Sequence, residues 1–245
     1  MTDITRVAMW SGPRNISTAV MRSWGSRSDT IVCDEPLYAH YLLASGADHP
    51  GASEVVAHHE VNLEKVVHWL LGPLPPGKSV FYQKHMAHHL LPGMDLNWID
   101  SLTNCFLIRE PSEMITSLTR VLPNPGLAET GLPQQVDLFD KERQRTGRTP
   151  PVLDARDVLE NPERLLKLLC DSLGVDFSPA MLTWESGVRD TDGVWGKYWY
   201  EKVWKSSGFA KYSHKLARVP PRFSGLLAEC RDLYERLYEH RLRVN

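Results

Sequence analysis

A loop that could bind an anion lies near the start of the chain, between a predicted strand and a predicted helix. Residues 7–10 form an apolar run typical of a strand, and Ile16, Val20 and Trp24 then recur on one face of a helix. The first amide groups of a helix have no partner inside it, and the positive end of the helix dipole favours phosphate or sulfate there. Arg14 adds a full positive charge. The predicted anion-binding residues are Gly12, Pro13, Arg14, Asn15, Ile16, Ser17 and Thr18.

This loop differs from the phosphate loop of nucleoside triphosphatases. The GxxxxGK[ST] pattern requires a glycine and a lysine where this chain has Ile16 after Asn15. The apolar residues 30–33, followed by Asp34 and Glu35, nevertheless resemble an acidic strand end of such enzymes. A P-loop kinase or ATPase therefore stays open as an alternative. The other two alternatives are an inactive nucleotide-binding module and an ordinary helix N-terminus that carries a polar cap.

Groups that could move a proton follow two predicted strands. The strand Thr30–Cys33 leads to Glu35, and the strand Ser79–Gln83 delivers Lys84 and His85 to its end. Ligands of open parallel sheets gather at the carboxyl ends of the strands. An imidazole, with an ordinary pKa of about 6.5, can accept a proton at neutral pH. His85 is therefore the first candidate for a general base, Glu35 competes with it, and Lys84 is expected to assist as a positive charge.

A second turn from strand to helix offers further anion ligands. The predicted strand Thr103–Ile108 is followed by Arg109, and Pro111 suits the first turn of a helix that runs to about Val121. Arg109 presents a fork of hydrogen-bond donors, and Ser117 on the helix presents a hydroxyl. Together these two side chains could hold a phosphate dianion.

Residues 10–19, WSGPRNISTA, and 106–120, FLIREPSEMITSLTR, resemble the sulfotransferase family, which uses 3′-phosphoadenosine 5′-phosphosulfate as its sulfuryl donor. The resemblance implies that the first loop, with Arg14, cradles the 5′-phosphosulfate. It implies that Arg109 and Ser117, eight residues apart, bind the 3′-phosphate. It further implies transfer to a hydroxyl or amine of a small acceptor, with no metal.

Two more assignments follow from the resemblance. Some branches of the family use a glutamate as the base, which keeps Glu35 beside His85 as a candidate. A basic, glycine-containing stretch closes over the 3′-phosphate in the family, and its loose counterpart here contains Arg189. Residues 184–209 also mix aromatic rings with cations, a pattern that can hold an adenine ring or can anchor a loop on the core.

Strands and helices alternate along the chain, which predicts an α/β fold. The expected architecture is a three-layer sandwich with a mainly parallel central sheet flanked by helices, similar to P-loop nucleotide-binding folds. A length of 245 residues with 42% hydrophobic content suits one domain over 1–245. Further elements are predicted as helices at 54–71, 134–145, 161–174 and 224–241, and as a strand at 152–154.

Composition narrows the range of partners. A formal net charge of -2 provides no general attraction for nucleic acid. Four scattered cysteines without a CxxC pair predict buried thiols in a reducing, cytoplasmic setting, and no run approaches the ~18 apolar residues of a membrane span. His85, His88 and His89 lack the further ligands of a zinc site, so no metal is expected. The expected partners are a nucleotide donor and a small-molecule acceptor, and the oligomeric state is open.

Overall fold

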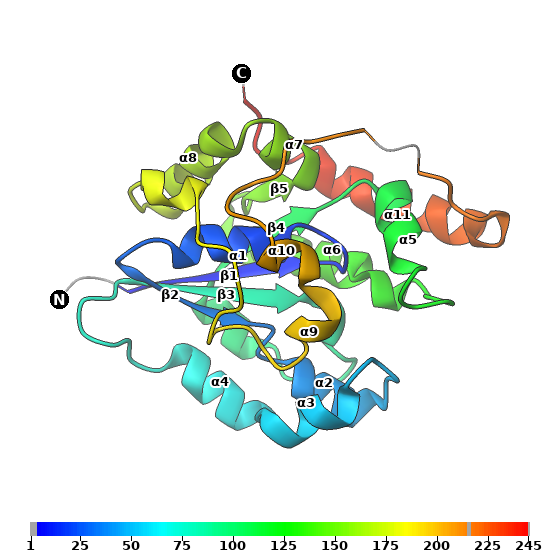
Figure 1. Ribbon diagram of the computed structural model, residues 1–245, viewed down its shortest axis with the longest axis horizontal. Helices are drawn as coiled ribbons and strands as arrows, with labels where there is room; N and C mark the ends of the chain where they lie inside the picture. Colours follow the sequence, from blue (N-terminus) through cyan, green and yellow to red (C-terminus); the bar gives the residue numbers. More distant parts are fainter. Residues whose placement is uncertain (1–3, 215–216, 245) are drawn as a thin grey trace.

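A five-stranded parallel sheet forms the centre of the computed structural model, which describes residues 4–214 and 217–244 (Figure 1). The strands are β1 (Thr5–Ser11), β2 (Thr30–Asp34), β3 (Val80–Met86), β4 (Thr103–Ile108) and β5 (Val152–Asp154). They lie in the order β2-β3-β1-β4-β5, with every neighbouring pair parallel. The predicted α/β fold is confirmed. Residues 1–3 and 245, at the ends of the expected domain, lie outside the described part.

Helices connect the strands and cover the sheet. The α-helices of the described residues are α1 (Ser17–Gly25), α2 (Tyr38–Ser45), α3 (Ala52–His58), α4 (Leu63–Leu71), α5 (Pro111–Leu118), α6 (Leu132–Thr146), α7 (Ala155–Glu160), α8 (Pro162–Leu173), α9 (Gly196–Trp199), α10 (Glu201–Trp204) and α11 (Ser224–Tyr238). Short 3₁₀ turns add η1 (Ala87–His89), η2 (Asn97–Ser101), η3 (Ala128–Thr130), η4 (Pro179–Leu182) and η5 (Pro221–Phe223). Within the described residues, no helix is both long and apolar enough to cross a bilayer.

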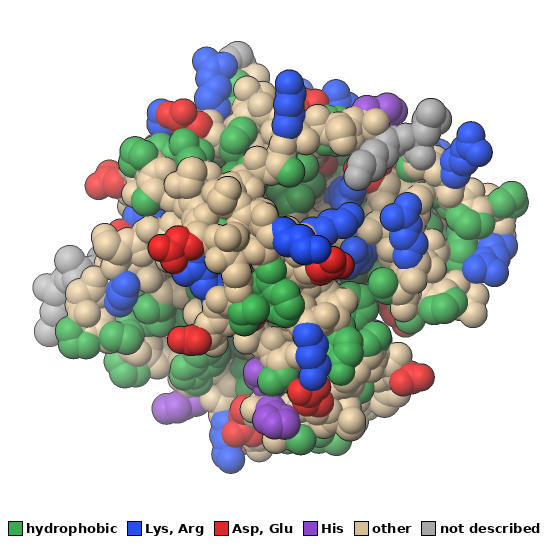
Figure 2. All heavy atoms as spheres, viewed as in Figure 1, with side chains coloured by type: hydrophobic (Ala, Val, Ile, Leu, Met, Phe, Trp, Pro, Cys, Tyr) green, Lys and Arg blue, Asp and Glu red, His purple; other side chains and the backbone are tan. Residues whose placement is uncertain are grey.

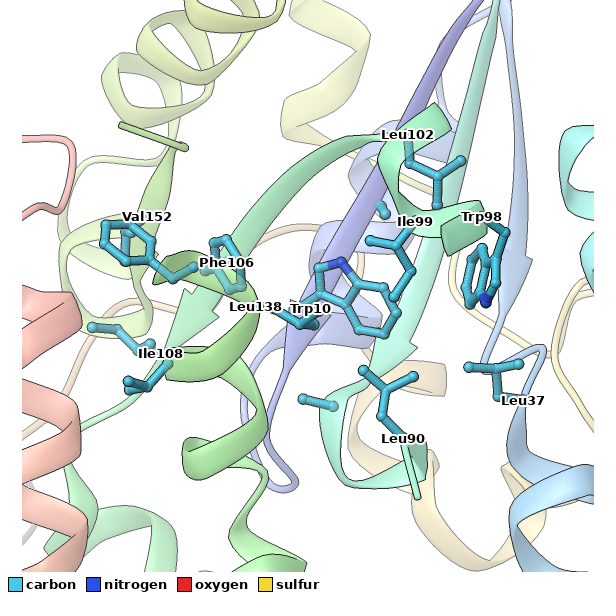
Figure 3. Packing of buried hydrophobic residues seen from close by; sticks show 14 of the residues in the cluster. Trp10, Leu37, Leu90, Trp98, Ile99, Leu102, Phe106, Ile108, Leu138 and Val152 are labelled. Carbon is cyan, nitrogen blue, oxygen red and sulfur yellow. The ribbon is translucent and has the colours of Figure 1, made fainter. Parts of the chain in front are cut away.

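Alternate residues of a strand point to opposite sides of the sheet. Because apolar residues occupy both sets of positions in these strands, the sheet is apolar on both faces. Trp10 and its alternates pack against α4, α6 and α11, whereas Met9 and its alternates pack against α1, α7 and α8. Figure 3 shows Trp10 of β1 in the first cluster, near Leu138 of α6 and Ile99 of η2. Two buried layers therefore fix the strands, and their carboxyl ends meet at one edge.

Several predicted elements have different bounds in the structure, and two of these differences bear on the site. The strand expected to end at Gln83 continues to Met86, so Lys84 and His85 lie inside β3 and not beyond it. Hydrogen bonding to β1 and β2 continues through this stretch, and its polar side chains are buried. The helix expected over 54–71 is two helices, because the chain is extended at Asn62, whose side chain caps α4.

The edge strand β5 is tied to the last helix. Tyr234 of α11 donates a hydrogen bond from its hydroxyl to Asp154 Oδ2 (3.0 Å), and Asp154 Oδ1 accepts from the Arg156 amide and so caps α7. Beyond α11, the Leu242 amide donates to the Val152 carbonyl (2.8 Å). These contacts hold β5 and the start of α7 against α11, which lies far from both in the sequence.

Candidate functional site

The loop between β1 and α1 is held in place by the neighbouring segments. Asn15 donates from its side chain to the Leu107 carbonyl (2.9 Å). With its amide oriented to suit its neighbours, Gln135 of α6 accepts from the Gly12 amide (3.1 Å). A Cβ atom at Gly12 would lie 2.3 Å from the Thr130 carbonyl oxygen, so only glycine fits there. The predicted loop is thus rigidly placed at the carboxyl edge of the sheet.

The start of α1 keeps its anion-binding capacity. Ile16 at the N-cap gives no side-chain cap, and the first turn carries no acidic residue. Ser17 and Thr18 therefore offer amide groups, a dipole end and hydroxyls with no competing carboxylate in their own helix.

Arg14 stands at the centre of a cationic group (Arg14, Arg109 and Arg120). Arg14 Nε donates to Ser117 Oγ (3.1 Å), and Arg109 Nη1 donates to the Arg14 carbonyl (2.6 Å). Burial lowers the pKa of Arg14, and the charges of Arg109 and Arg120 lower it further. Arg14 also has a left-handed backbone (φ 60°), which is uncommon for a residue with a side chain. Clustered cations and a strained backbone are features of an anion site.

One carboxylate faces this cationic group. Glu113 accepts from Arg109 Nη2 (2.9 Å) and Nε (3.1 Å), and it also accepts from the Tyr212 hydroxyl (2.8 Å). Figure 2 shows Lys and Arg side chains gathering in the middle and on the right of the visible face, over the region where α5 and α10 lie in Figure 1. The structure brings Arg14, Arg109 and Ser117 together, and the two residues that the sequence paired, Arg109 and Ser117, both contact Arg14.

A second polar group lies at the ends of β2 and β3. Lys84, 1% exposed, donates to Asp34 Oδ1 (2.7 Å), to Glu35 Oε1 and to the Tyr200 hydroxyl (2.9 Å). Tyr200 in turn donates to Asp34 Oδ2 (2.7 Å) and accepts from Trp195 Nε1 (3.1 Å). This buried network joins two strands of the sheet to the segment that carries α9 and α10.

The charges of this network oppose one another. Burial alone would lower the pKa of Lys84, but the carboxylates of Asp34 and Glu35 outweigh it and raise that pKa. Burial raises the pKa of Glu35, although the Lys84 charge counteracts the rise. Glu35 Oε2 makes no hydrogen bond to any described residue, and the Glu35 backbone is left-handed (φ 41°). Glu35 is therefore a carboxylate with one oxygen fixed and one free.

His85 lies on the opposite face of β3 from Lys84, because neighbours in a strand alternate. Its ring stacks on Trp10 (4.3 Å between centroids), and Nε2 contacts Gln83 Oε1 (3.1 Å). Burial lowers the pKa of His85 to about 3, with a further contribution from the Lys84 charge. The structure does not bring His85 to the same side as Lys84 and Glu35.

His88 and His89 are also buried, beside the rings of Tyr38 and Tyr41. Burial lowers the pKa of His88 to about 3. In residues 4–214 and 217–244, no group of three or more His, Cys, Asp and Glu side chains has a metal-binding arrangement.

Arg189 lies apart from the cationic group. Its side chain donates to the Glu185 carbonyl (2.9 Å), and it lines a cavity of about 830 Å³ beside the C-terminal half of α1. Nearby, the buried pair Arg22–Asp192 (2.6 Å) joins α1 to the segment 187–204. Asp192 Oδ2 also accepts from Trp204 Nε1 (2.9 Å).

A cavity of about 530 Å³ lies at the outer side of β2. Asp34 and Glu35 are in its wall, so it opens next to the Lys84 network. The opposite walls come from residues 59–69 and 190–195. Sequence reasoning assigned no role to Arg120 and no contact to Asp34 or Tyr200. The available signals were the paired Asp34-Glu35 at a strand end and the aromatic residues of 184–209, which include Tyr200.

A family model described as a sulfotransferase domain matches residues 5–237. Two proteins of Arabidopsis thaliana, branched-chain-amino-acid aminotransferase-like proteins 1 and 2, are 36% and 34% identical over 94% of this chain. The match covers 41% of each of them, so the chain spans about two fifths of the length of these curated relatives.

Solved structures share the fold at low sequence identity. The sulfotransferase domain of the Synechococcus PCC 7002 olefin synthase has a TM-score of 0.57 at 17% identity, covering 99% of this chain and 98% of that one. A sulfotransferase from Alicyclobacillus acidocaldarius has a TM-score of 0.58 at 11% identity, with 97% of both chains covered. The sulfotransferase domain from the curacin biosynthetic pathway has a TM-score of 0.52 at 15% identity, covering 100% of this chain and 94% of that one.

Proposed function

The chain belongs to the sulfotransferase domain family, and from that premise we propose that it transfers a sulfuryl group from 3′-phosphoadenosine 5′-phosphosulfate to a hydroxyl group of a small acceptor. The observation that carries the choice of donor is that Arg14 and Arg109 of the cationic group converge with Ser117 beside an uncapped helix start. A nucleotide with anionic groups at both its 5′ and 3′ positions suits such a site. Asp34 and Glu35 provide a separate place for the acceptor.

The donor fits the residues that are present. The pKa of Arg14 is lowered by burial and by the neighbouring charges of Arg109 and Arg120, so a bound anion would relieve that repulsion. We assign the 5′-phosphosulfate to Arg14 and to the amides of residues 14–18, and the 3′-phosphate to Arg109 and Ser117. The donor supplies an activated sulfur–oxygen bond; the protein supplies charge and position.

In the proposed step, the acceptor oxygen forms a bond to sulfur while the bond from sulfur to the phosphate oxygen breaks. The adenosine bisphosphate leaves with the electron pair, and Glu35 Oε2 takes the acceptor proton. Lys84 fixes the other carboxylate oxygen, and Arg14 stabilises the charge that develops on the leaving phosphate. Glu35 is preferred to His85 as the base because it lines a cavity and has one oxygen without a hydrogen bond to a described residue, whereas His85 is enclosed by Trp10 and Trp98.

The test is calorimetric titration with 3′-phosphoadenosine 5′-phosphate and with AMP, which lacks the 3′-phosphate. Wild type should prefer the bisphosphate, and Arg109→Ala should reduce that preference by about 10- to 100-fold through loss of a charge-assisted fork. Ser117→Ala should cost less, since it loses a neutral hydrogen bond. Arg164→Ala, an exposed change on α8, is the control. Tighter binding of ATP with magnesium than of the bisphosphate would support the kinase alternative instead.

A further inference from the structure

The cavity at the outer side of β2 (the β2 cavity) has a wall rich in carboxylates. Figure 1 shows the yellow segment between η4 and α9 running across this side of the sheet. Its loop contributes Asp190 and Asp192, while the chain between α3 and α4 contributes Glu60. With Asp34 and Glu35, five carboxylates line a space of about 530 Å³.

Cations compensate this charge only in part. Lys65, paired with Glu60 (3.6 Å), is the one ammonium in the wall within the described residues. Behind the wall, the single charge of Lys84 serves both Asp34 and Glu35, and Arg22 neutralises Asp192. Asp190 is exposed and has no ion pair to a described residue. The β2 cavity therefore keeps a net negative charge, which repels anions and favours cations.

Aromatic rings complete the wall. Trp69, 54% exposed, and Trp195, which is buried, both line the β2 cavity. His59 stands 4.7 Å from the Trp195 ring, and burial lowers its pKa, so it adds no positive charge at neutral pH. Aromatic faces next to carboxylates are the arrangement by which proteins recognise protonated amines.

One wall of this cavity contains the candidate base. Glu35 Oε1 is held by Lys84, and Oε2 is free to accept from a bound hydroxyl. We propose that the β2 cavity binds the acceptor and that the acceptor carries a protonated amine in addition to the hydroxyl that is sulfated. This inference rests on the proposed function, since it assigns the second substrate of the same reaction. The amine would lie toward Asp190, Glu60 and Trp69, leaving the hydroxyl at Glu35.

The selectivity of the β2 cavity for cations is tested with probes that share one frame and carry a cationic, a neutral or an anionic group on it. On a phenolic frame these are tyramine, 4-(2-hydroxyethyl)phenol and 4-hydroxyphenylacetate; on a sugar frame they are glucosamine and glucose. Their dissociation constants are measured by calorimetry with the protein saturated with 3′-phosphoadenosine 5′-phosphate. We expect the cation to bind at least about fivefold more tightly than the neutral probe on one frame, and the anion to bind most weakly. The preference should shrink as salt is added.

A double variant, Glu60→Gln with Asp190→Asn, should abolish the preference for the cation and leave binding of the neutral probe unchanged. Glu185→Gln is the matched control, because Glu185 lies in the same loop but is 91% exposed and outside the wall of the β2 cavity. Cationic probes that bind no better than neutral ones on both frames, or a preference that survives the double variant, would overturn the proposal. Binding of the bisphosphate at Arg109 is measured separately, so failure of the donor site would be recognised as a different result.

Discussion

At the scale of single residues, the two oxygens of Glu35 have different surroundings. Lys84 and Tyr200 contact Oε1, whereas Oε2 has no hydrogen bond to a described residue. Because burial raises the pKa of Glu35, this carboxylate is a stronger base than an exposed one. The asymmetry fits a group that is held by one atom and reacts through the other.

Replacing each of the two candidate bases in turn separates their roles. Glu35→Gln should lower kcat by about 10²- to 10⁴-fold with little change in donor affinity, because it removes the proton acceptor and keeps the shape. His85→Phe should retain most of kcat, since a ring can still stack on Trp10. Steady-state kinetics with calorimetry of the bisphosphate provides both quantities. A large loss of kcat in His85→Phe with normal donor binding would return the base to His85.

The Tyr200 hydroxyl should influence the pH dependence of the reaction. It lowers the pKa of Glu35 by hydrogen bonding, in opposition to burial, which raises it. A base works when deprotonated, so kcat/KM falls as the pH drops through the pKa of Glu35. Tyr200→Phe should therefore move this acidic limb to higher pH. Tyr198→Phe, an exposed change on α9, is the control and should leave the pH profile unchanged. If the acidic limb stays at the same pH in both variants, Tyr200 is excluded as a positioning residue.

At the scale of elements, one buried ion pair fixes the segment 187–204 on α1. The side chains of Arg22 and Asp192 are 4% and 2% exposed, and Asp192 also accepts from Trp204. This segment carries Tyr200 and one wall of the β2 cavity. The same helix α1 begins at the proposed donor loop, so a single element positions groups for both substrates.

Removing one partner of that pair should be costly. Asp192→Ala leaves the Arg22 charge buried without a partner, which costs about 3–5 kcal/mol in comparable cases. We expect faster amide hydrogen exchange and proteolysis in 187–204 before any change in the sheet. Replacing both residues, Arg22→Met with Asp192→Leu, should recover part of the loss. Equal exchange rates in wild type and Asp192→Ala would mean that other contacts hold the segment.

The sequence predicted most strands of the sheet but missed where β3 ends. Apolar periodicity finds buried strands, and Lys84 and His85 break that periodicity although they are buried. Their pairing with β1 and β2 depends on residues far away in the chain, which local pattern does not contain. For this reason the sequence put His85 beside Lys84, when alternation in a strand separates them.

At the scale of the whole molecule, the strand order divides the two proposed substrates. The donor groups follow β1 and β4, whereas Asp34 ends β2 and Glu35 follows it, on the other side of β3. Arg14 and Arg109 were predictable because each follows a strand in a recognisable turn, and Ser117 because the family resemblance places a serine eight residues after Arg109. The contribution of Tyr200 was not predictable, because it reaches Asp34 across 166 positions of sequence.

The contact between β5 and α11 should make stability depend on pH. Burial raises the pKa of Asp154 from 3.8 to about 6. The folded protein then holds this proton more tightly than the unfolded chain. The protonated Asp154 therefore contributes fully to the free energy of unfolding below pH 3.8, and this contribution is lost as the pH rises through about 6. The loss is on the order of 2–3 kcal/mol.

Asp154→Asn keeps Oδ1 as the acceptor for the Arg156 amide, its NH2 group can donate to the Tyr234 hydroxyl oxygen in place of the present contact, and the buried charge is removed. Urea unfolding should find it at least as stable as wild type at pH 7.5, with this difference declining toward pH 4. Asp140→Asn, an exposed change on α6, controls for general charge effects. If Asp154→Asn is less stable than wild type over the whole pH range, the ionised carboxylate of Asp154 itself stabilises the fold.

The left-handed backbone at Arg14 and Glu35 has a consequence for the evolution of this molecule. Within the described residues these are the two positions without glycine that have positive φ, and both carry proposed roles in the reaction. Glycine relieves such strain at either position. Selection for heat resistance alone would therefore favour replacements that inactivate the enzyme, and only continued demand for turnover would keep an arginine and a glutamate there.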